Sequence, residues 1–361
     1  EGVELGTPEQ DEREERRRYV FSRFVRGEVD RVEIERHGVR IQIEKHGDAW
    51  RMLAPVEYPA DTSAVEQLLS DLEFLEKERS VPRARAQARV GHPAAKLELR
   101  MRGRTIDLAV GEEDPTGRSV YLAVSGDEQI HLVPKEFVDA LSRSADNYRS
   151  KKVSAIRATK VERIEIARGG ASVRLDKRGS GWFFGPGSTL AGARASSSRV
   201  DDLLRDVEGL RAERFAPASA QEPDVTISVF EQGAREPKVV RLGPACPNQP
   251  HEVLARGDAM PAGATACVRD AIVAPATRSA EDLRERHVLL AREDEAQEVE
   301  LSGRGAKIVL KRAGEVWRFR EPADMPADRD AVDQMLRDLH AAEARGFLPA
   351  AEGARVGLSS P

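Results

Sequence analysis

Residues 32–50 read VEIERHGVRIQIEKHGDAW. Four aliphatic residues in this stretch alternate with polar or charged ones: Val32, Ile34, Ile41 and Ile43. A two-residue period of this kind is typical of strands that have one buried face. Because Gly38 lies between the two alternating runs, the stretch predicts a β-hairpin, followed by a third strand that carries Trp50 over the same face.

The same pattern occurs three times along the chain. Trp50, Trp182 and Trp317 are 132 and 135 residues apart, and the positions 18, 16, 9 and 7 residues before each are aliphatic. In the later copies these positions are Ile164, Ile166, Val173 and Leu175, then Val299, Leu301, Ile308 and Leu310. Each predicted turn contains glycine, at Gly38, at Gly169 with Gly170, and at Gly303 with Gly305. Such self-similarity predicts a repeated structural unit.

Each tryptophan is followed by an amphipathic helix. Asp61, Ser196 and Asp328 are in the N-cap position, where a side-chain oxygen accepts free backbone N–H groups. The predicted apolar faces are Val65, Leu68, Leu69, Leu72 and Leu75, then Val200, Leu203, Leu204, Val207 and Leu210, then Val332, Met335, Leu336 and Leu339. An aspartate recurs in each helix, at Asp71, Asp206 and Asp338. Because there is one in each unit, we expect a helix-surface role for them rather than acid–base chemistry.

The second half of each unit is predicted to be a β-meander with a short helix after it. Alternating runs occur at 96–101, 105–110, 120–124 and 130–133, before a helix at 135–141. The second copy has runs at 225–230, 238–242, 252–255 and 265–268, with a helix from Ala271. The third copy stops at 355–358, where the first copy begins its meander.

We therefore predict an α+β fold of tandem repeats, elongated, with two full copies and one partial copy. The expected boundaries are 1–28 for a charged N-terminal helix or stalk, 29–152 and 153–287 for the full units, and 288–361 for the partial unit. Residues 9–18 are almost all charged, and the aromatic end of the first segment is expected to lie on the first unit.

Composition excludes several classes of protein. The 361 residues contain 57 Lys and Arg against 62 Asp and Glu, a formal charge of −5, so no nucleic-acid partner is expected. No run of about 18 apolar residues is present to span a membrane. Motifs for phosphate loops, zinc proteases, serine hydrolases and Cys-x2-Cys sites are absent as well. We expect no catalytic residues, no cofactor and no metal. The three tryptophans are expected to be core residues, although a row of tryptophans can also bind sugars.

Two features leave alternatives open. Cys246 and Cys267 lie around a proline-rich loop, and a disulfide is the favoured interpretation, with free thiols or a metal site that includes His251 as the others. A disulfide would indicate an oxidising compartment. Between 79 and 96 there are five basic residues and no acidic one: Arg79, Arg83, Arg85, Arg89 and Lys96. This stretch is either a solvated linker or a patch for anionic glycans or lipids.

The repeated motif resembles the bacterial family called domain of unknown function 4340. The residues that carry the resemblance are Val32, Ile34, Trp50, Pro59, Ala60, Asp61, Val65, Leu68, Leu69, Asp71 and Leu72, with their counterparts in the other copies. Gly357, Leu358 and Pro361 also match a Gly-Leu-x-x-Pro signature of that family, which the first copy alters and the second lacks. The resemblance extends over 29–361 and gives no catalytic residues.

Members of that family typically begin with one membrane-spanning helix and accompany ABC-type transport systems similar to those of gliding motility. The resemblance therefore implies a periplasmic protein tethered to the inner membrane by a helix upstream of Glu1, with residues 9–18 as the stalk. We expect a non-enzymatic scaffold or accessory subunit whose partners are transporter subunits. The alternative is a binding module for anionic envelope glycans or lipids, and an enzyme is the third.

Overall fold

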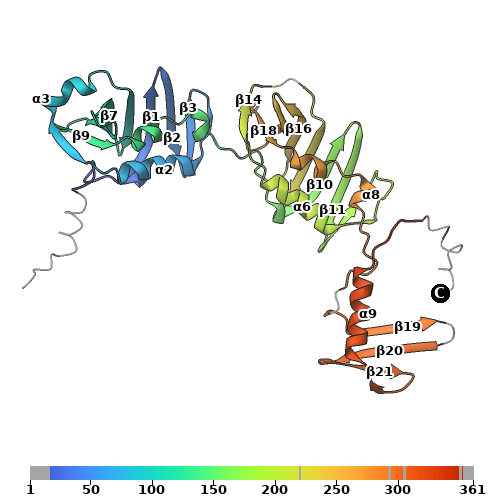
Figure 1. The fold of residues 1–361 in the computed structure, drawn as a ribbon. Helices are drawn as coiled ribbons and strands as arrows, with labels where there is room; N and C mark the ends of the chain where they lie inside the picture. The colour runs from blue at the N-terminus through green and yellow to red at the C-terminus, as the bar shows by residue number, and fades with distance from the viewer. Residues whose placement is uncertain (1–16, 219–220, 292–293, 304–305, 349–351, 353–361) are drawn as a thin grey trace, which may run out of the picture. The chain divides into compact units, whose positions relative to one another are not determined.

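The computed structural model of the chain describes residues 17–218, 221–291, 294–303, 306–348 and 352 (Figure 1). It is an α+β structure of antiparallel sheets with short helices. Its contacts divide the chain into two compact units, Glu1–Ser172 with Leu203–Thr277, and Val173–Asp202 with Arg278–Pro361. Gly305, the charged run before residue 17 and the predicted end of the third copy at 355–361 lie outside the described residues.

The first sheet has nine antiparallel strands. In spatial order they are β4 (Tyr58–Pro59), β3 (Ala49–Ala54), β2 (Val39–His46), β1 (Val29–Arg36), β6 (Ala95–Met101), β7 (Arg104–Glu113), β8 (Ser119–Val124), β9 (Gln129–Pro134) and β5 (Arg79–Pro82). The hairpin predicted from the sequence is present, with Val32 opposite Ile43 and Ile34 opposite Ile41. The two halves of the sheet join at β1 and β6, where Val32 lies opposite Leu99.

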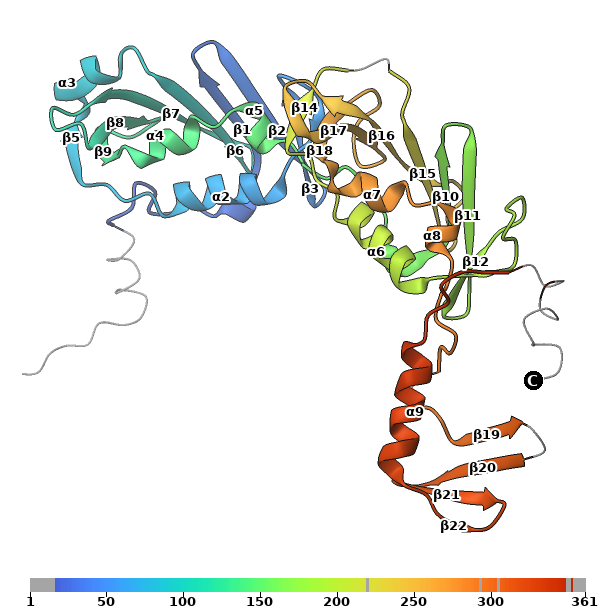
Figure 2. The same ribbon diagram turned by 45° about the vertical axis from the view of Figure 1, so that its right-hand side comes forward.

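Helix α2 (Thr62–Glu73) covers one face of this sheet (Figure 2). Its N-cap is Asp61, whose carboxylate accepts a hydrogen bond from the backbone N–H of Ala64 at 3.2 Å. Its buried residues are those of the predicted apolar face: Val65, Leu68, Leu69 and Leu72. The short helices α4 (Glu136–Leu141) and α5 (Ala145–Tyr148) contribute Phe137, Leu141 and Tyr148 to the same core.

A second, smaller core lies where β5 continues into α3 (Arg83–Ala86) and the 3-10 helix η2 (Gln87–Val90). There Ala86 and Val90 pack with Ala123 and Ile130. Gly111 of β7 is required by this crossing, because a Cβ at that position would lie 2.1 Å from the carbonyl oxygen of Arg89. The sequence reasoning missed β5, which pairs with β9 through Arg79 opposite Leu132.

The second sheet also has nine strands, in the corresponding order. They are β13 (Arg194–Ala195), β12 (Gly181–Phe184), β11 (Ala171–Arg178), β10 (Val161–Arg168), β15 (Val225–Glu231), β16 (Lys238–Cys246), β17 (Gln249–Gly257), β18 (Thr265–Arg269) and β14 (Arg214–Ala216). Its helices are α6 (Ser197–Glu208), α7 (Val273–Ala276) and α8 (Ala280–Leu283), with the 3-10 turns η3 (Ala158–Lys160) and η4 (Asp270–Ile272). The predicted apolar positions of α6, from Val200 to Val207, are buried.

The third sheet has four strands among the described residues: β19 (Glu298–Gly303), β20 (Ala306–Ala313), β21 (Val316–Glu321) and β22 (Met325–Pro326). Helix α9 (Arg329–Ala341) packs on it, and Asp328 caps the helix by accepting a hydrogen bond from Ala331 N–H at 3.2 Å. The core of this part consists of Leu310, Trp317, Val332 and Leu336.

The segment before the first sheet differs from the predicted helix over its described part. Residues 17–28 contain the 3-10 helix η1 (Arg26–Glu28) and no α-helix. Instead the backbone N–H of Val20 donates to the carbonyl of Leu75 at 2.8 Å, just after α2, and Phe24 is buried in the first core. The aromatic end of the segment does lie on the first unit, and this backbone hydrogen bond fixes it beside the end of α2.

Candidate functional site

The three tryptophans are buried, and each is hydrogen-bonded to a carboxylate early in the helix that follows. The indole Nε1–H donates to Glu66 from Trp50 at 3.3 Å, to Asp201 from Trp182 at 2.9 Å, and to Asp333 from Trp317 at 3.1 Å. A cation five residues before each tryptophan lies over its ring: Lys45, Lys177 and Arg312. A buried indole whose N–H is bonded within its own unit presents no face to a sugar.

These carboxylates were missed by the sequence reasoning, which singled out the aspartates five residues further along. Asp71 and Asp338 instead accept hydrogen bonds from Gln67 and Gln334 of their own helices, at 2.7 and 2.8 Å. A signal was available in the sequence, because Glu66 and Asp333 both lie 16 residues after their tryptophan. The carboxylate that holds the indole and the one further along are five residues apart, about 1.4 turns of helix, so they lie on different faces.

The five basic residues of 79–96 do not gather into one patch. The Arg83 guanidinium donates to the backbone carbonyl oxygens of Asp127 at 2.9 Å and Val124 at 2.7 Å. It therefore binds the last residue of β8 and the turn that follows. Arg89 forms an ion pair with Glu112 at 2.7 Å, and Lys96 forms one with Glu35 at 3.7 Å. Arg79 lies within β5, and Arg85 is exposed on α3.

A cavity of about 320 Å³ opens on the face of the first sheet opposite α2. Its charged lining residues come from β1, β6, β7 and α3: Glu33, Glu35, Arg83, Lys96, Glu98 and Asp107. A hydrogen bond from Arg40, followed by its charge and that of Arg31, holds the pKa of Glu33 below its ordinary value despite partial burial. Glu33 therefore stays ionised at neutral pH and is not suited to donate a proton.

One buried cluster has the residue types of a hydrolase triad. His131 of β9 is buried, with Nδ1 2.9 Å from Ser80 Oγ and Nε2 3.1 Å from Asp127 Oδ2. Burial raises the pKa of Asp127, but hydrogen bonds from Gln129 and His131 outweigh it and leave that pKa lowered. These hydrogen bonds tie β5 to β9 and to the turn before β9.

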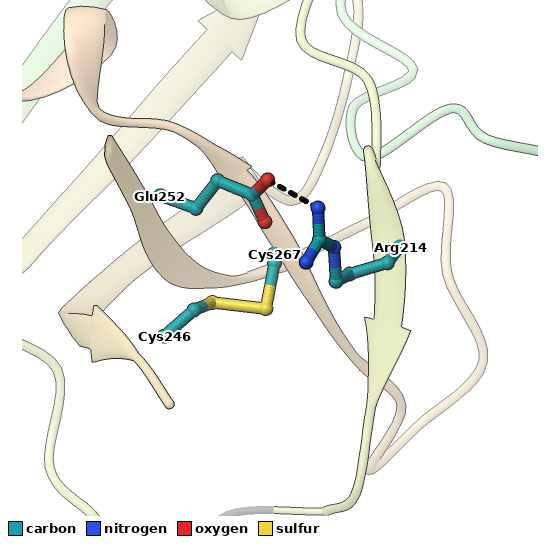
Figure 3. Close-up of a disulfide and its surroundings, with 4 residues drawn as sticks. All are labelled: Arg214, Cys246, Glu252 and Cys267. Carbon is teal, nitrogen blue, oxygen red and sulfur yellow. Dashed lines mark hydrogen bonds and ion pairs between the residues drawn. A yellow bond between two sulfur atoms is a disulfide. The ribbon is translucent and has the colours of Figure 1, made fainter. Parts of the chain in front are cut away.

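Cys246 and Cys267 form a disulfide between β16 and β18, with 6.0 Å between their Cα atoms (Figure 3). Glu252 of β17 lies beside it, and its carboxylate accepts a hydrogen bond from Arg214 at 2.8 Å. The two sulfurs and a Glu252 oxygen lie within 4.8 Å of one another, the spacing of a metal site. Because the sulfurs are bonded together, neither is a thiolate ligand. His251, the earlier candidate ligand, is exposed and lies 3.8 Å from Asp270.

These observations define an α+β protein built mostly of antiparallel sheets. The family model described as a domain of unknown function (DUF4340) matches residues 50–227, and this segment belongs to that family. The match confirms the resemblance over a shorter range than the predicted 29–361. No curated protein matched the chain. Across the described residues, no helix has both the length and the apolar character needed to cross a bilayer.

Proposed function

We propose that the chain is a non-enzymatic scaffold or accessory subunit of an ABC-type transport or envelope complex, acting through protein–protein contacts. The proposal rests on the position of the exposed apolar side chains. Of eleven large exposed hydrophobic residues among those described, seven lie between 288 and 348: Val288, Leu290, Leu301, Val316, Met325, Leu339 and Leu348. Large apolar side chains left in solvent within one unit are the kind of surface that a protein partner covers.

A tandem-repeat interpretation supports the proposal. The first two sheets have corresponding strand orders, and their central seams match, with Val32 opposite Leu99 and Ile164 opposite Val229. The tryptophan, its carboxylate and its cation recur three times. We take the units to be 29–152, 153–287 and the partial 288–361. Proteins built from repeats commonly bind through extended surfaces rather than through one deep pocket.

The proposed location is the periplasm, with a tether to the inner membrane. Two arguments support it: the family resemblance, and the disulfide, since such bonds persist in oxidising compartments. The alternative of binding anionic glycans or lipids is weakened because Arg83 is hydrogen-bonded to backbone carbonyls, while Arg89 and Lys96 form surface ion pairs with carboxylates of the first unit.

The test is to tag the full-length protein in its own host, solubilise the membranes gently and identify by mass spectrometry what co-purifies. Transporter subunits in stoichiometric amounts that resist added salt are the expected result. A protein that purifies alone contradicts stable docking. Binding to anionic glycan or lipid that disappears as salt is raised would favour the alternative, because exposed charges are screened.

A further inference from the structure

A second cavity of the first unit, of about 400 Å³, lies between the β1–β2 hairpin and the segment that joins α4 to α5. Ile34, Ile41 and Leu141, which line it, belong to the first core. Arg36 lies opposite Val39 in the hairpin, two residues beyond the Ile34–Ile41 pair. Because alternate residues of a strand share a face, this pair points to the same side as the core. The cavity is therefore the open end of the layer between sheet and helices.

The ionisable side chains that line this cavity are all basic: Arg36, His37 and Arg143. None of them forms a side-chain hydrogen bond or an ion pair with another described residue. The Nε of Arg36 is buried and has no hydrogen-bond partner. A buried donor of this kind carries a desolvation cost that an acceptor on a ligand offsets. The chain has a formal charge of −5, yet this lining contains no carboxylate to balance its two arginines.

The second unit uses the equivalent arginine differently. Arg168 has the place of Arg36, because it lies opposite Val225 of β15 as Arg36 lies opposite Ala95 of β6. Its guanidinium donates to the backbone carbonyl of Thr277, the residue directly after α7, at 3.5 Å. Among the described residues, Arg36 forms no such bond to the residue directly after α4. The first unit therefore has the same arginine with its donors left for another acceptor.

The remaining polar side chains of the lining favour a ligand with few hydroxyl groups. Ser142 Oγ donates to the carbonyl of Val138 at 2.6 Å, and Ser144 Oγ donates to Asn147 Oδ1 at 2.9 Å. Recognition of a sugar needs several neutral donors and acceptors, and these two hydroxyl groups have given their protons to the fold. The lining offers cationic donors beside aliphatic side chains, so it suits an anion on a hydrocarbon chain.

We propose that this cavity binds a single-chain anionic amphiphile, a carboxylate or phosphate group on an aliphatic chain. The anionic group accepts hydrogen bonds from Arg36 and Arg143, since a guanidinium matches the geometry of both groups. The chain lies against Val39, which is 52% exposed, and the edge of the core at Ile41 and Leu141. The volume is within the range of about 300–1,000 Å³ that is usual for ligand sites. This ligand site is independent of the proposed scaffold function.

The probe is octyl phosphate, titrated into the full chain below its micelle concentration and followed by isothermal titration calorimetry. We expect saturable binding at one site. Hexyl phosphate should bind about tenfold more weakly, because it buries two fewer methylene groups. Inorganic phosphate lacks the chain and should bind more weakly still, whereas octyltrimethylammonium has the same chain with a positive head and should not bind.

Arg36→Gln and Arg143→Gln should each weaken octyl phosphate binding by about tenfold, because each removes a charged hydrogen-bond donor. Arg85→Gln is the matched control, since Arg85 is an exposed arginine of the same unit outside the cavity. A second variant, Val39→Asp, adds a negative charge at an exposed position and should also weaken binding, whereas Val56→Asp, at a residue 42% exposed outside the cavity, should not. Thermal unfolding without ligand checks that each variant is folded.

Absence of saturable binding overturns the proposal, as does an equal loss in Arg36→Gln and Arg85→Gln. Inorganic phosphate that binds as tightly as octyl phosphate also overturns it, because the chain then contributes nothing. Residues 1–16 are acidic, and displacement of octyl phosphate by a peptide of that sequence would make the occupant the chain's own segment and overturn it.

Vesicles of phosphatidylglycerol and phosphatidylcholine distinguish the two sources of such an anion. If octyl phosphate releases the chain from these vesicles, and Arg36→Gln weakens the vesicle binding too, the ligand is a membrane lipid. If the chain binds octyl phosphate and ignores the vesicles, the ligand is a soluble amphiphile. The site is supported in both cases.

Discussion

Removal of the disulfide should destabilise the second sheet and leave the first unchanged. The change is Cys246→Ala with Cys267→Ala. Alanine is the suitable replacement because both cysteines are buried, and serine would add an unpaired hydroxyl to the core. The disulfide joins residues 21 positions apart and links the end of β16 to the middle of β18.

The magnitude follows from the length of the closed loop. In the chain-entropy model a loop with this separation of 21 residues stabilises the fold by about 3 kcal/mol at 25 °C. For a urea m-value of about 2 kcal/mol/M, the unfolding midpoint should fall by about 1.5 M.

Each sheet contains one tryptophan, so tryptophan fluorescence can follow the unfolding of one sheet at a time. With Trp50→Phe and Trp317→Phe, fluorescence reports the second sheet through Trp182 alone, and the double alanine change is made in that background. The control retains Trp50 as the only tryptophan and follows the first sheet, whose midpoint should not move. The reasoning is refuted if the Trp182 midpoint is unchanged, or if the denatured, unreduced wild-type chain shows two free thiols.

Two further predictions concern single carboxylates. Asp333→Ala leaves the buried Trp317 N–H without its partner and should lower the free energy of unfolding by about 1 kcal/mol, whereas Asp338→Ala should cost less than about 0.5 kcal/mol in the same urea titration. Because the pKa of Glu33 is lowered on folding, its stabilising contribution is present above the unfolded value near 4.5 and is lost as pH falls through the folded value. Arg40→Gln should raise the pKa of Glu33, and an NMR titration of its carboxyl carbon that shows no shift would contradict the assignment.

The parts of the fold that the sequence predicts are those with a local pattern. The β1–β2 hairpin and α2 follow from alternation and helical spacing within a few residues. Strand β5 has no such pattern, because its four residues are only partly buried and its partner β9 lies about 50 residues further along the chain. Its existence depends on tertiary pairing, which outweighs local preference.

For a related reason, the sequence alone could not show which of the basic residues between 79 and 96 have partners. Arg83, Arg89 and Lys96 form a run without acidic neighbours, yet their partners Val124, Glu112 and Glu35 lie on other strands. A run of like charges along the sequence therefore predicts a basic patch only where the fold places no carboxylates beside those charges.

The third sheet also bears on how the chain folds as it leaves the ribosome. In the described part of the third unit, four strands and α9 enclose Trp317 without the five strands that extend the other sheets. By the same geometry, a nascent chain can bury Trp50 once α2 has emerged, before any residue of β6 has been synthesised. The outer edge of β1 is then available for pairing, and strands β6 to β9 add to the sheet in the order of translation. The pairing of segments that are distant in sequence, which is slow, therefore begins on a sheet that is already ordered.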